Sequence, residues 1–309
     1  MHNFLVFLIC ILPIQTFAAD TAIQILGIGN SFTQNATKYL PEIIQASTEV
    51  DADISLAVIG GCSLERHVKL AQAHEADSED GNKYTFVKNR ATVKKNASLS
   101  EILQATDWDY ITIQQVSQLS YKSETYFPYA GQLIRYIQKY APEAEIVIHE
   151  TWPHSVDSHR AKSWGLDPDD MYAKLHVAYA QIGQDFGLRI IPVGTAFQKA
   201  KESPLWDYQP RSTDTTQLNY PEDKDNLPDE SQSLHRIHFW KKEKDGTMKV
   251  INDGFHAGKY GEYLGALIWY EFFFNLDARE VSLQPKGFSE AQAVSLREIA
   301  HDTMREANE

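Results

Sequence analysis

Short apolar runs alternate with longer segments of helical periodicity along most of the chain. The runs are rich in β-branched residues and end in glycine or polar residues, as buried strands do. They predict strands at residues 23–28, 54–59, 110–113, 146–148 and 190–193. Apolar spacings of three and four predict helices at residues 36–50, 63–76, 126–140, 170–186, 258–274 and 289–304. Strands separated by helices require crossover connections, so we expect an α/β protein with a parallel sheet.

The segment from Lys201 to Asp245 departs from this alternation. It is polar, rich in Asp, Glu, Lys, Pro and Ser, and has no clear period. A long segment of this kind is typical of a loop insertion. We therefore expect a single domain over residues 20–309 that carries this insertion.

The N-terminus has the pattern of an export signal. Residues 4–14 form a nearly unbroken apolar run, and small residues follow at Ala18 and Ala19. The run is shorter than the roughly 20 residues that a bilayer span needs. Residues 1–19 are therefore predicted to be a secretory signal peptide, with a buried N-terminal strand as the alternative. No later segment is long and apolar enough to span a membrane, so we expect a secreted or periplasmic protein without a membrane anchor.

Composition narrows the possible partners. The chain has 29 Lys and Arg residues against 42 Asp and Glu residues, a formal net charge of −13. A general nucleic-acid binder needs a basic face, so we expect no nucleic-acid partner. Removal of residues 1–19 leaves Cys62 as the sole cysteine, which excludes an internal disulfide. The histidine pairs at 154/159 and 235/238 lack a third ligand at metal spacing, so no metal is expected there.

Polar residues with chemical potential follow the predicted strands. Ser31 comes directly after the first strand, and Gly60-Gly61 follows the second. Asp253 and His256 stand three residues apart before a predicted helix. A serine at a strand-to-helix turn can act as a nucleophile if a histidine takes its proton and a carboxylate orients that histidine. Each of these residues alone is more often a cap or turn residue, so the interpretation depends on their combination.

Two of these segments resemble the SGNH, or GDSL-like, hydrolases. Gly29-Asn30-Ser31-Phe32-Thr33 resembles their first block, and Asp253-Gly254-Phe255-His256 resembles their last. The Gly-Asn-Ser-Phe start resembles an uncharacterised bacterial subgroup. The resemblance implies a three-layer α/β/α sandwich with a five-stranded parallel flavodoxin-like sheet. It also implies ester hydrolysis without a cofactor, with Ser31 as nucleophile, His256 as base and Asp253 as the acid that orients it.

The same resemblance implies an oxyanion hole. The backbone N–H of Ser31 matches one donor and that of Gly61 a second, with Gly60 as the alternative. The family's third donor is an asparagine after the third strand, and this chain has none there. Gln115 is predicted to replace it because its amide is a neutral donor in the right place. Gln114 and Gln118 are the alternatives.

The expected substrate is an O-acylated carbohydrate, most simply an acetyl ester, because export suits a polymer outside the cell. Aromatic residues of the insertion could stack on sugar rings or merely fix a long loop: Trp206, Tyr208, Tyr220 and Trp240. A lipase or general acyl esterase is the alternative enzyme. A non-catalytic carbohydrate-binding protein on a degenerate SGNH fold is the alternative from another class. Cys62 is expected to be a buried structural residue.

Overall fold

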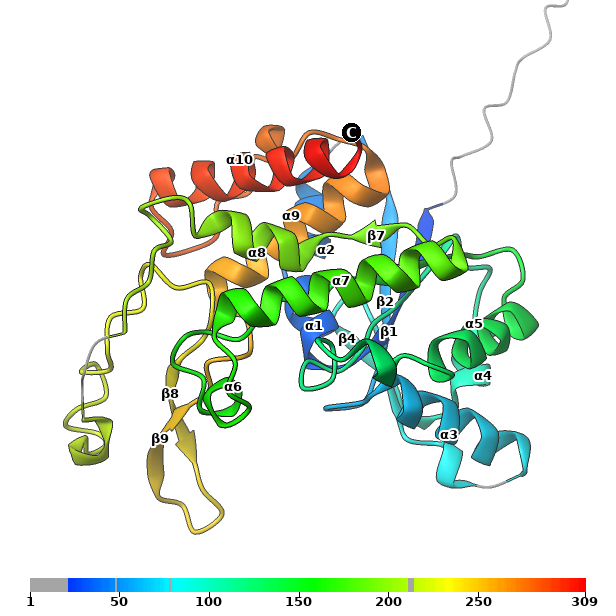
Figure 1. Cartoon of the computed structure of the whole chain (residues 1–309), viewed down its shortest axis with the longest axis horizontal. Coiled ribbons are helices and arrows are strands. Elements are labelled where there is room, and N and C mark those ends of the chain that lie inside the picture. Colours follow the sequence, from blue (N-terminus) through cyan, green and yellow to red (C-terminus); the bar gives the residue numbers. More distant parts are fainter. Residues whose placement is uncertain (1–21, 48, 78, 211–213) are drawn as a thin grey trace, which may run out of the picture.

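The computed structural model describes residues 22–309 except 48, 78 and 211–213, so the predicted signal peptide lies outside the described residues. A seven-stranded sheet lies at the centre, in the order β4-β3-β2-β1-β5-β6-β7 (Figure 1). Its strands are β1 (Ile23–Gly29), β2 (Ala52–Val58), β3 (Tyr84–Lys88), β4 (Ala91–Ala97), β5 (Tyr110–Ile113), β6 (Glu145–His149) and β7 (Ile190–Ile191). The run β2-β1-β5-β6-β7 is parallel, which confirms the five predicted strands in a flavodoxin-like order.

Helices cover both faces of the sheet and enclose two cores. Successive side chains of a strand point to opposite faces, so Ile25 enters one core while Leu26 and Ile28 enter the other. The core that contains Ile25 is closed by α1 (Ser31–Ala36), α2 (Leu40–Ala46), α8 (Val193–Ala200), α9 (Lys259–Phe274) and α10 (Glu290–Ala307). The opposite core is closed by α3 (Leu64–Glu75), α4 (Leu99–Leu103), α5 (Tyr129–Tyr140) and α7 (Pro168–Phe186). The fold is the expected three-layer α/β/α sandwich.

The remaining described elements are short. Helix α6 (His159–Ser163) follows the loop after β6. Single 3₁₀ turns lie at Glu79–Gly81, Ser123–Thr125, Thr215–Gln217 and Ala278–Glu280. In the part of the chain that the structure describes, no helix has the length and apolar character to cross a bilayer.

A hairpin at the edge of the sheet was not predicted. β3 pairs antiparallel with β2, and β4 pairs antiparallel with β3. Most of β4 is exposed, including Lys94 and Lys95. An exposed edge strand needs no apolar run, and charged residues there discourage pairing with another chain. The periodicity that marks buried strands is therefore missing from this segment.

The polar insertion is partly a second hairpin rather than a loop throughout. β8 (His238–Lys242) pairs antiparallel with β9 (Met248–Asn252) in a separate two-stranded sheet. Trp206 is buried against the ring of Tyr260, and its indole N–H donates to Ser295. These contacts show that Trp206 holds the insertion against the helices and is not exposed for stacking on a sugar ring.

Candidate active site

Ser31 begins α1 immediately after β1, in a turn that the neighbouring residues impose. The side chain of Asn30 caps α1 by accepting from the N–H of Phe32 at 3.0 Å. A Cβ atom on Gly29 would lie 2.0 Å from the Thr33 hydroxyl, so only glycine permits α1 to fold back this closely on β1. The sequence Gly-Asn-Ser therefore fixes the position of the Ser31 hydroxyl at the end of the sheet.

Asn30 is held by both ends of its carboxamide. Its nitrogen donates to the backbone carbonyl of Cys62 at 3.0 Å, while its oxygen accepts from the amide of Gln114 at 2.9 Å. An aspartate could accept the bonds from Phe32 and Gln114 but could not donate to the Cys62 carbonyl. The carboxamide of asparagine therefore satisfies contacts at this position that a carboxylate could not.

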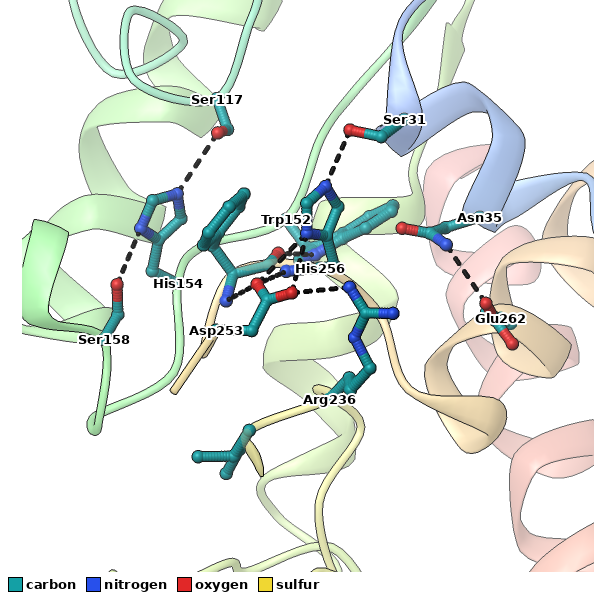
Figure 2. Close-up of polar contacts among 12 residues, drawn as sticks. Ser31, Asn35, Ser117, Trp152, His154, Ser158, Arg236, Asp253, His256 and Glu262 are labelled. Atoms are coloured by element: carbon teal, nitrogen blue, oxygen red, sulfur yellow. Dashed lines mark hydrogen bonds and ion pairs between the residues drawn. The ribbon is translucent and has the colours of Figure 1, made fainter. Parts of the chain in front are cut away.

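Ser31, His256 and Asp253 form one hydrogen-bonded line (Figure 2). The Nε2 atom of His256 lies 2.7 Å from the Ser31 hydroxyl, and its Nδ1 atom lies 2.9 Å from Oδ2 of Asp253. The carboxylate accepts from Nδ1–H, which leaves Nε2 to accept the serine proton. The structure thus brings together the three residues predicted to form the triad, although 225 residues separate Ser31 from His256.

Asp253 is a buried carboxylate that several donors hold in its charged form. Burial by itself would raise its pKa, but hydrogen bonds from His256 and Arg236 outweigh burial and hold the pKa well below its usual range. The backbone N–H of His256 also donates to Oδ1, at 3.1 Å. Asp253 therefore remains ionised at neutral pH and can stabilise a protonated His256.

Arg236 was not among the predicted site residues. Its guanidinium lies 2.6 Å from Oδ2 of Asp253 and packs over the ring of Phe239. The segment around it runs beside the Asp253 loop: Asp253 N–H donates to the Ile237 carbonyl, and Arg236 N–H donates to the His256 carbonyl. The polar insertion therefore supports the triad, a role that no local sequence pattern indicates.

Trp152, in the loop after β6, connects the turn that carries Ser31 to the loop that carries His256. Its indole N–H donates to the carbonyl of Phe255 at 3.0 Å. Its ring stacks on Phe32 with centroids 4.3 Å apart and on Phe197 at 4.8 Å. Because Phe32 follows Ser31 and Phe255 precedes His256, one buried side chain holds the segments that carry Ser31 and His256.

Two backbone donors predicted for the oxyanion hole are available. Within the described residues, the N–H groups of Ser31 and Gly61 have no hydrogen-bond acceptor. Gly61 is exposed and has φ +59°, a conformation that favours glycine. The neighbouring residue Ile59 donates its N–H to the carbonyl of Gly29, which keeps this loop beside Ser31. Gly60 lies in the same exposed turn and stays the alternative.

The prediction for Gln115 is wrong. Its side chain is fully buried, and its amide nitrogen donates to the carbonyl and the hydroxyl of Thr125. Its oxygen accepts from the backbone N–H groups of Leu64 and Val116. Both ends of the carboxamide therefore brace the start of α3 and the loop after β5, and neither is free to reach an oxyanion.

The other two glutamines occupy different environments. Gln114 is buried behind the Ser31 turn, where its oxygen accepts from the Thr33 hydroxyl and lies 2.9 Å from Nδ1 of His149. It supports Asn30 and does not face solvent. Gln118 is exposed in the loop after β5.

Cys62 has the properties of a structural residue. It is fully buried beside the turn, and burial raises the pKa of its thiol to about 12. A thiol with such a pKa is neutral at physiological pH and is a poor nucleophile. This agrees with its expected packing role.

A group of three potential metal ligands lies away from the triad. In the described residues, ligand atoms of Glu271, Asp277 and His301 lie within 4.8 Å of one another. Glu271 accepts from His301 and from the Ala278 N–H, and Asp277 pairs with Arg279. These groups already satisfy one another's hydrogen-bonding needs. Glu271 lies roughly 18 Å along α9 from the first residue of that helix, because an α-helix rises 1.5 Å per residue.

Comparison with known proteins adds a family and a related crystal structure. A family model described as a domain of unknown function, DUF4886, matches residues 24–222. A DUF4886 family protein from Bacteroides uniformis shares 24% identity and a TM-score of 0.73, over 94% of this chain and 97% of that one. This likeness shows a shared fold.

More distant structures come from proteins described as hydrolases. A protein from Slackia heliotrinireducens, proposed to be an SGNH hydrolase, has 21% identity and a TM-score of 0.47, over 81% of this chain and 98% of that one. A lipase/acylhydrolase from Enterococcus faecalis has 12% identity and a TM-score of 0.44, over 81% and 94%. No significant match to a curated protein was found.

Proposed function

The chain belongs to the DUF4886 family, and we propose that it is a serine hydrolase that cleaves an ester through an acyl-enzyme on Ser31. The observation that carries the proposal is the line from the Ser31 hydroxyl through His256 to Asp253, with distances of 2.7 and 2.9 Å. A binding protein has no need for this arrangement, whereas nucleophilic catalysis by serine depends on it.

The geometry supports a two-step reaction. The Ser31 oxygen attacks the ester carbonyl carbon while His256 takes the hydroxyl proton at Nε2. The tetrahedral intermediate collapses as His256 returns that proton to the leaving alcohol, and the acyl group stays on Ser31. Water then attacks the acyl-enzyme with His256 again as the base, which releases the acid and restores Ser31.

Fixed charges and dipoles lower the barrier. The ionised Asp253 stabilises the protonated His256 that forms in each step. The free N–H groups of Ser31 and Gly61 are suited to hold the negative oxygen of the tetrahedral intermediate. His256 is 21% exposed on its side chain, so an ester can reach the reacting atoms from solvent.

We propose an O-acylated carbohydrate, most simply an acetylated one, as the substrate. A cavity of about 250 Å³ lies between the loop after β6 and the polar insertion, and its wall includes apolar, aromatic and polar side chains. Its lining includes His154, Lys201, Trp206, Tyr208 and Gln209. Polar members of this wall such as Lys201 and Gln209 can hydrogen-bond sugar hydroxyls. The predicted signal peptide would place the enzyme outside the cytoplasm, where acylated polymers occur.

The test compares two kinds of ester with the purified protein and its Ser31→Ala variant. We expect release of acetate from acetylated polysaccharides and hydrolysis of short nitrophenyl esters, both lost in Ser31→Ala. A preference for long-chain nitrophenyl esters would indicate a lipase instead. No turnover, together with no labelling of Ser31 by a fluorophosphonate, would contradict a serine hydrolase and favour a binding protein.

A further inference from the structure

A second serine–histidine pair lies beside the triad (Figure 2). Nε2 of His154 lies 3.2 Å from the hydroxyl of Ser117, and Nδ1 lies 3.1 Å from the hydroxyl of Ser158. Ser117 follows β5, and the other two residues belong to the loop after β6. All three side chains are buried, although Ser117 keeps 3% of its surface exposed.

The direction of these hydrogen bonds follows from the surroundings of each group. Burial lowers the pKa of His154 to about 3, so its ring is neutral and carries one N–H. Ser158 caps α6 by accepting from the N–H of Ala161. Ser158 is fully enclosed, so its own proton needs an acceptor, and Nδ1 of His154 is the acceptor within reach.

The hydroxyl proton of Ser117 is therefore not used in its contact with His154. With Nδ1 accepting, Nε2 carries the ring proton and donates to the Ser117 oxygen. Among the described residues, the Ser117 hydroxyl has no acceptor for its own proton. Of the three hydrogen-bonded residues, Ser117 is the one with some exposed surface, so a ligand can supply that acceptor.

Ser117 lies at the same end of the sheet as Ser31. β5 pairs directly with β1 in parallel, with Gly27 opposite Thr112, and both serines follow these positions by four or five residues. In Figure 2 the Ser117 and Ser31 hydroxyls lie at the same end of the two imidazoles.

The loop after β6 also contacts the loop that carries Asp253 and His256. The N–H of Ser155 donates to the carbonyl of Gly254 at 2.7 Å. The ring of Phe255 contacts both imidazoles, with centroids 4.2 Å from His256 and 5.4 Å from His154. Gly254 lies so close to Ser158 that a Cβ atom would be 3.0 Å from its Cα.

Ser117 is not suited to be a second nucleophile. His154 is oriented by a neutral hydroxyl, whereas His256 is oriented by a carboxylate. A neutral partner gives no charge stabilisation to a protonated imidazole in a buried site. Ser117 therefore keeps its proton and acts as a hydrogen-bond donor.

We propose that the Ser117 hydroxyl donates to the carbonyl oxygen of the ester attacked by Ser31, beside the N–H groups of Ser31 and Gly61. His154 and Ser158 are positioning residues that keep the Ser117 proton directed toward the site. This inference rests on the proposed function and gives the loop after β5 the donor that Gln115 does not provide.

The test measures kcat and KM of Ser117→Ala with a short nitrophenyl ester. Loss of one oxyanion donor lowers kcat by about 10²-fold or more with KM within about threefold. Affinity for a trifluoromethyl ketone, which forms a tetrahedral adduct with an active serine, should fall by the same factor as kcat/KM. Ser120→Ala is the matched control: the hydroxyl of this buried serine in the same loop donates to the Ser117 backbone carbonyl and not to the Ser117 hydroxyl, so its folded fraction should keep kcat within about threefold.

The outcomes separate this inference from the proposed function. If the wild-type protein hydrolyses esters and folded Ser117→Ala keeps kcat within about threefold, the role of Ser117 is overturned while the triad stands. If the wild-type protein neither turns over esters nor labels at Ser31, the proposed function fails. Should Ser117→Ala not fold, Ser117→Cys replaces it: a thiol is a weak donor, so at least a tenfold loss of kcat supports the role and a wild-type kcat overturns it.

Discussion

The guanidinium of Arg236 lies 2.6 Å from Oδ2 of Asp253, the same oxygen that accepts the hydrogen bond from His256. Asp253 thus accepts hydrogen bonds from two side chains, His256 in its own loop and Arg236 in the polar insertion. The insertion therefore helps to hold Asp253 in its charged form.

Replacing Ser31 or His256 with alanine should abolish turnover without unfolding the protein. Without the nucleophile or its base, the acyl-enzyme cannot form, and the loss of kcat should be on the order of 10⁴–10⁶. Asp253→Asn should cost less, since Ser31 and His256 both stay in place. Steady-state kinetics with a circular dichroism spectrum of each variant checks the prediction. Near-native hydrolysis by folded Ser31→Ala would require another nucleophile.

Arg236→Gln should lower stability by about 1 kcal/mol at neutral pH, because Arg236 is half exposed and solvent weakens its pairing. The folded state holds the pKa of Asp253 below its ordinary value of 3.8, so this contribution is fully present above that value. It is lost as the pH falls through the lower pKa of the folded protein. The penalty should therefore be equal at about pH 8 and pH 6 and smaller below about pH 4.

Urea unfolding of wild-type protein and Arg236→Gln at these pH values measures that penalty. Arg189→Gln removes a comparable ion pair, with Glu145, at the far edge of the sheet and serves as the control for losing a half-exposed arginine. We expect kcat to fall in Arg236→Gln and to stay unchanged in Arg189→Gln. Equal kcat in both variants would argue against a supporting role of Arg236 in the triad.

Asn30→Asp should destabilise the protein although aspartate and asparagine have nearly the same shape. The substitution removes the donor to the Cys62 carbonyl and sets a carboxylate against that oxygen in a buried site. Leaving such a pair unsatisfied costs about 1–3 kcal/mol, and more when the group is charged. Thermal unfolding measures the loss, with the exposed Asn308→Asp as an isosteric control. A wild-type melting temperature for Asn30→Asp would show that the carboxamide donor is dispensable.

Gln115→Ala should reduce stability and leave catalysis intact. The variant strands the backbone N–H of Leu64 and removes the bonds to Thr125, at a cost of about 1–3 kcal/mol. The kcat of the folded fraction should stay within about threefold of wild type. A loss of 10²-fold or more in kcat at an unchanged melting temperature would return Gln115 to the oxyanion hole.

Cys62→Ser should keep most of its activity, and the native thiol should resist alkylation. Cys62 is fully buried and its pKa is raised to about 12, so little thiolate exists at neutral pH. Iodoacetamide treatment followed by mass spectrometry should show modification only after unfolding. Complete loss of turnover in folded Cys62→Ser would indicate a chemical role for the thiol.

The amino-acid sequence alone predicted the five parallel strands, and it pointed to Ser31, His256 and Asp253, which hydrogen bonds join in the structure. A buried strand needs a continuous apolar run, and a nucleophile with its base and acid needs particular residue types at strand ends, so both leave local signals. The edge hairpin of β3 and β4 has exposed, charged positions and leaves no such signal. It was found only in the structure.

The polar side chains that contact Asn30, Leu64 and Asp253 could be identified only from long-range packing. Gln114 and Gln115 are neighbours at the end of β5, yet one holds Asn30 on one side of the sheet and the other braces α3 on the opposite side. Arg236 reaches Asp253 through the pairing of two distant segments. The partner of a buried polar group is set by long-range packing, because the group must find a donor or acceptor wherever the fold encloses it. That information is absent from its neighbours in the sequence.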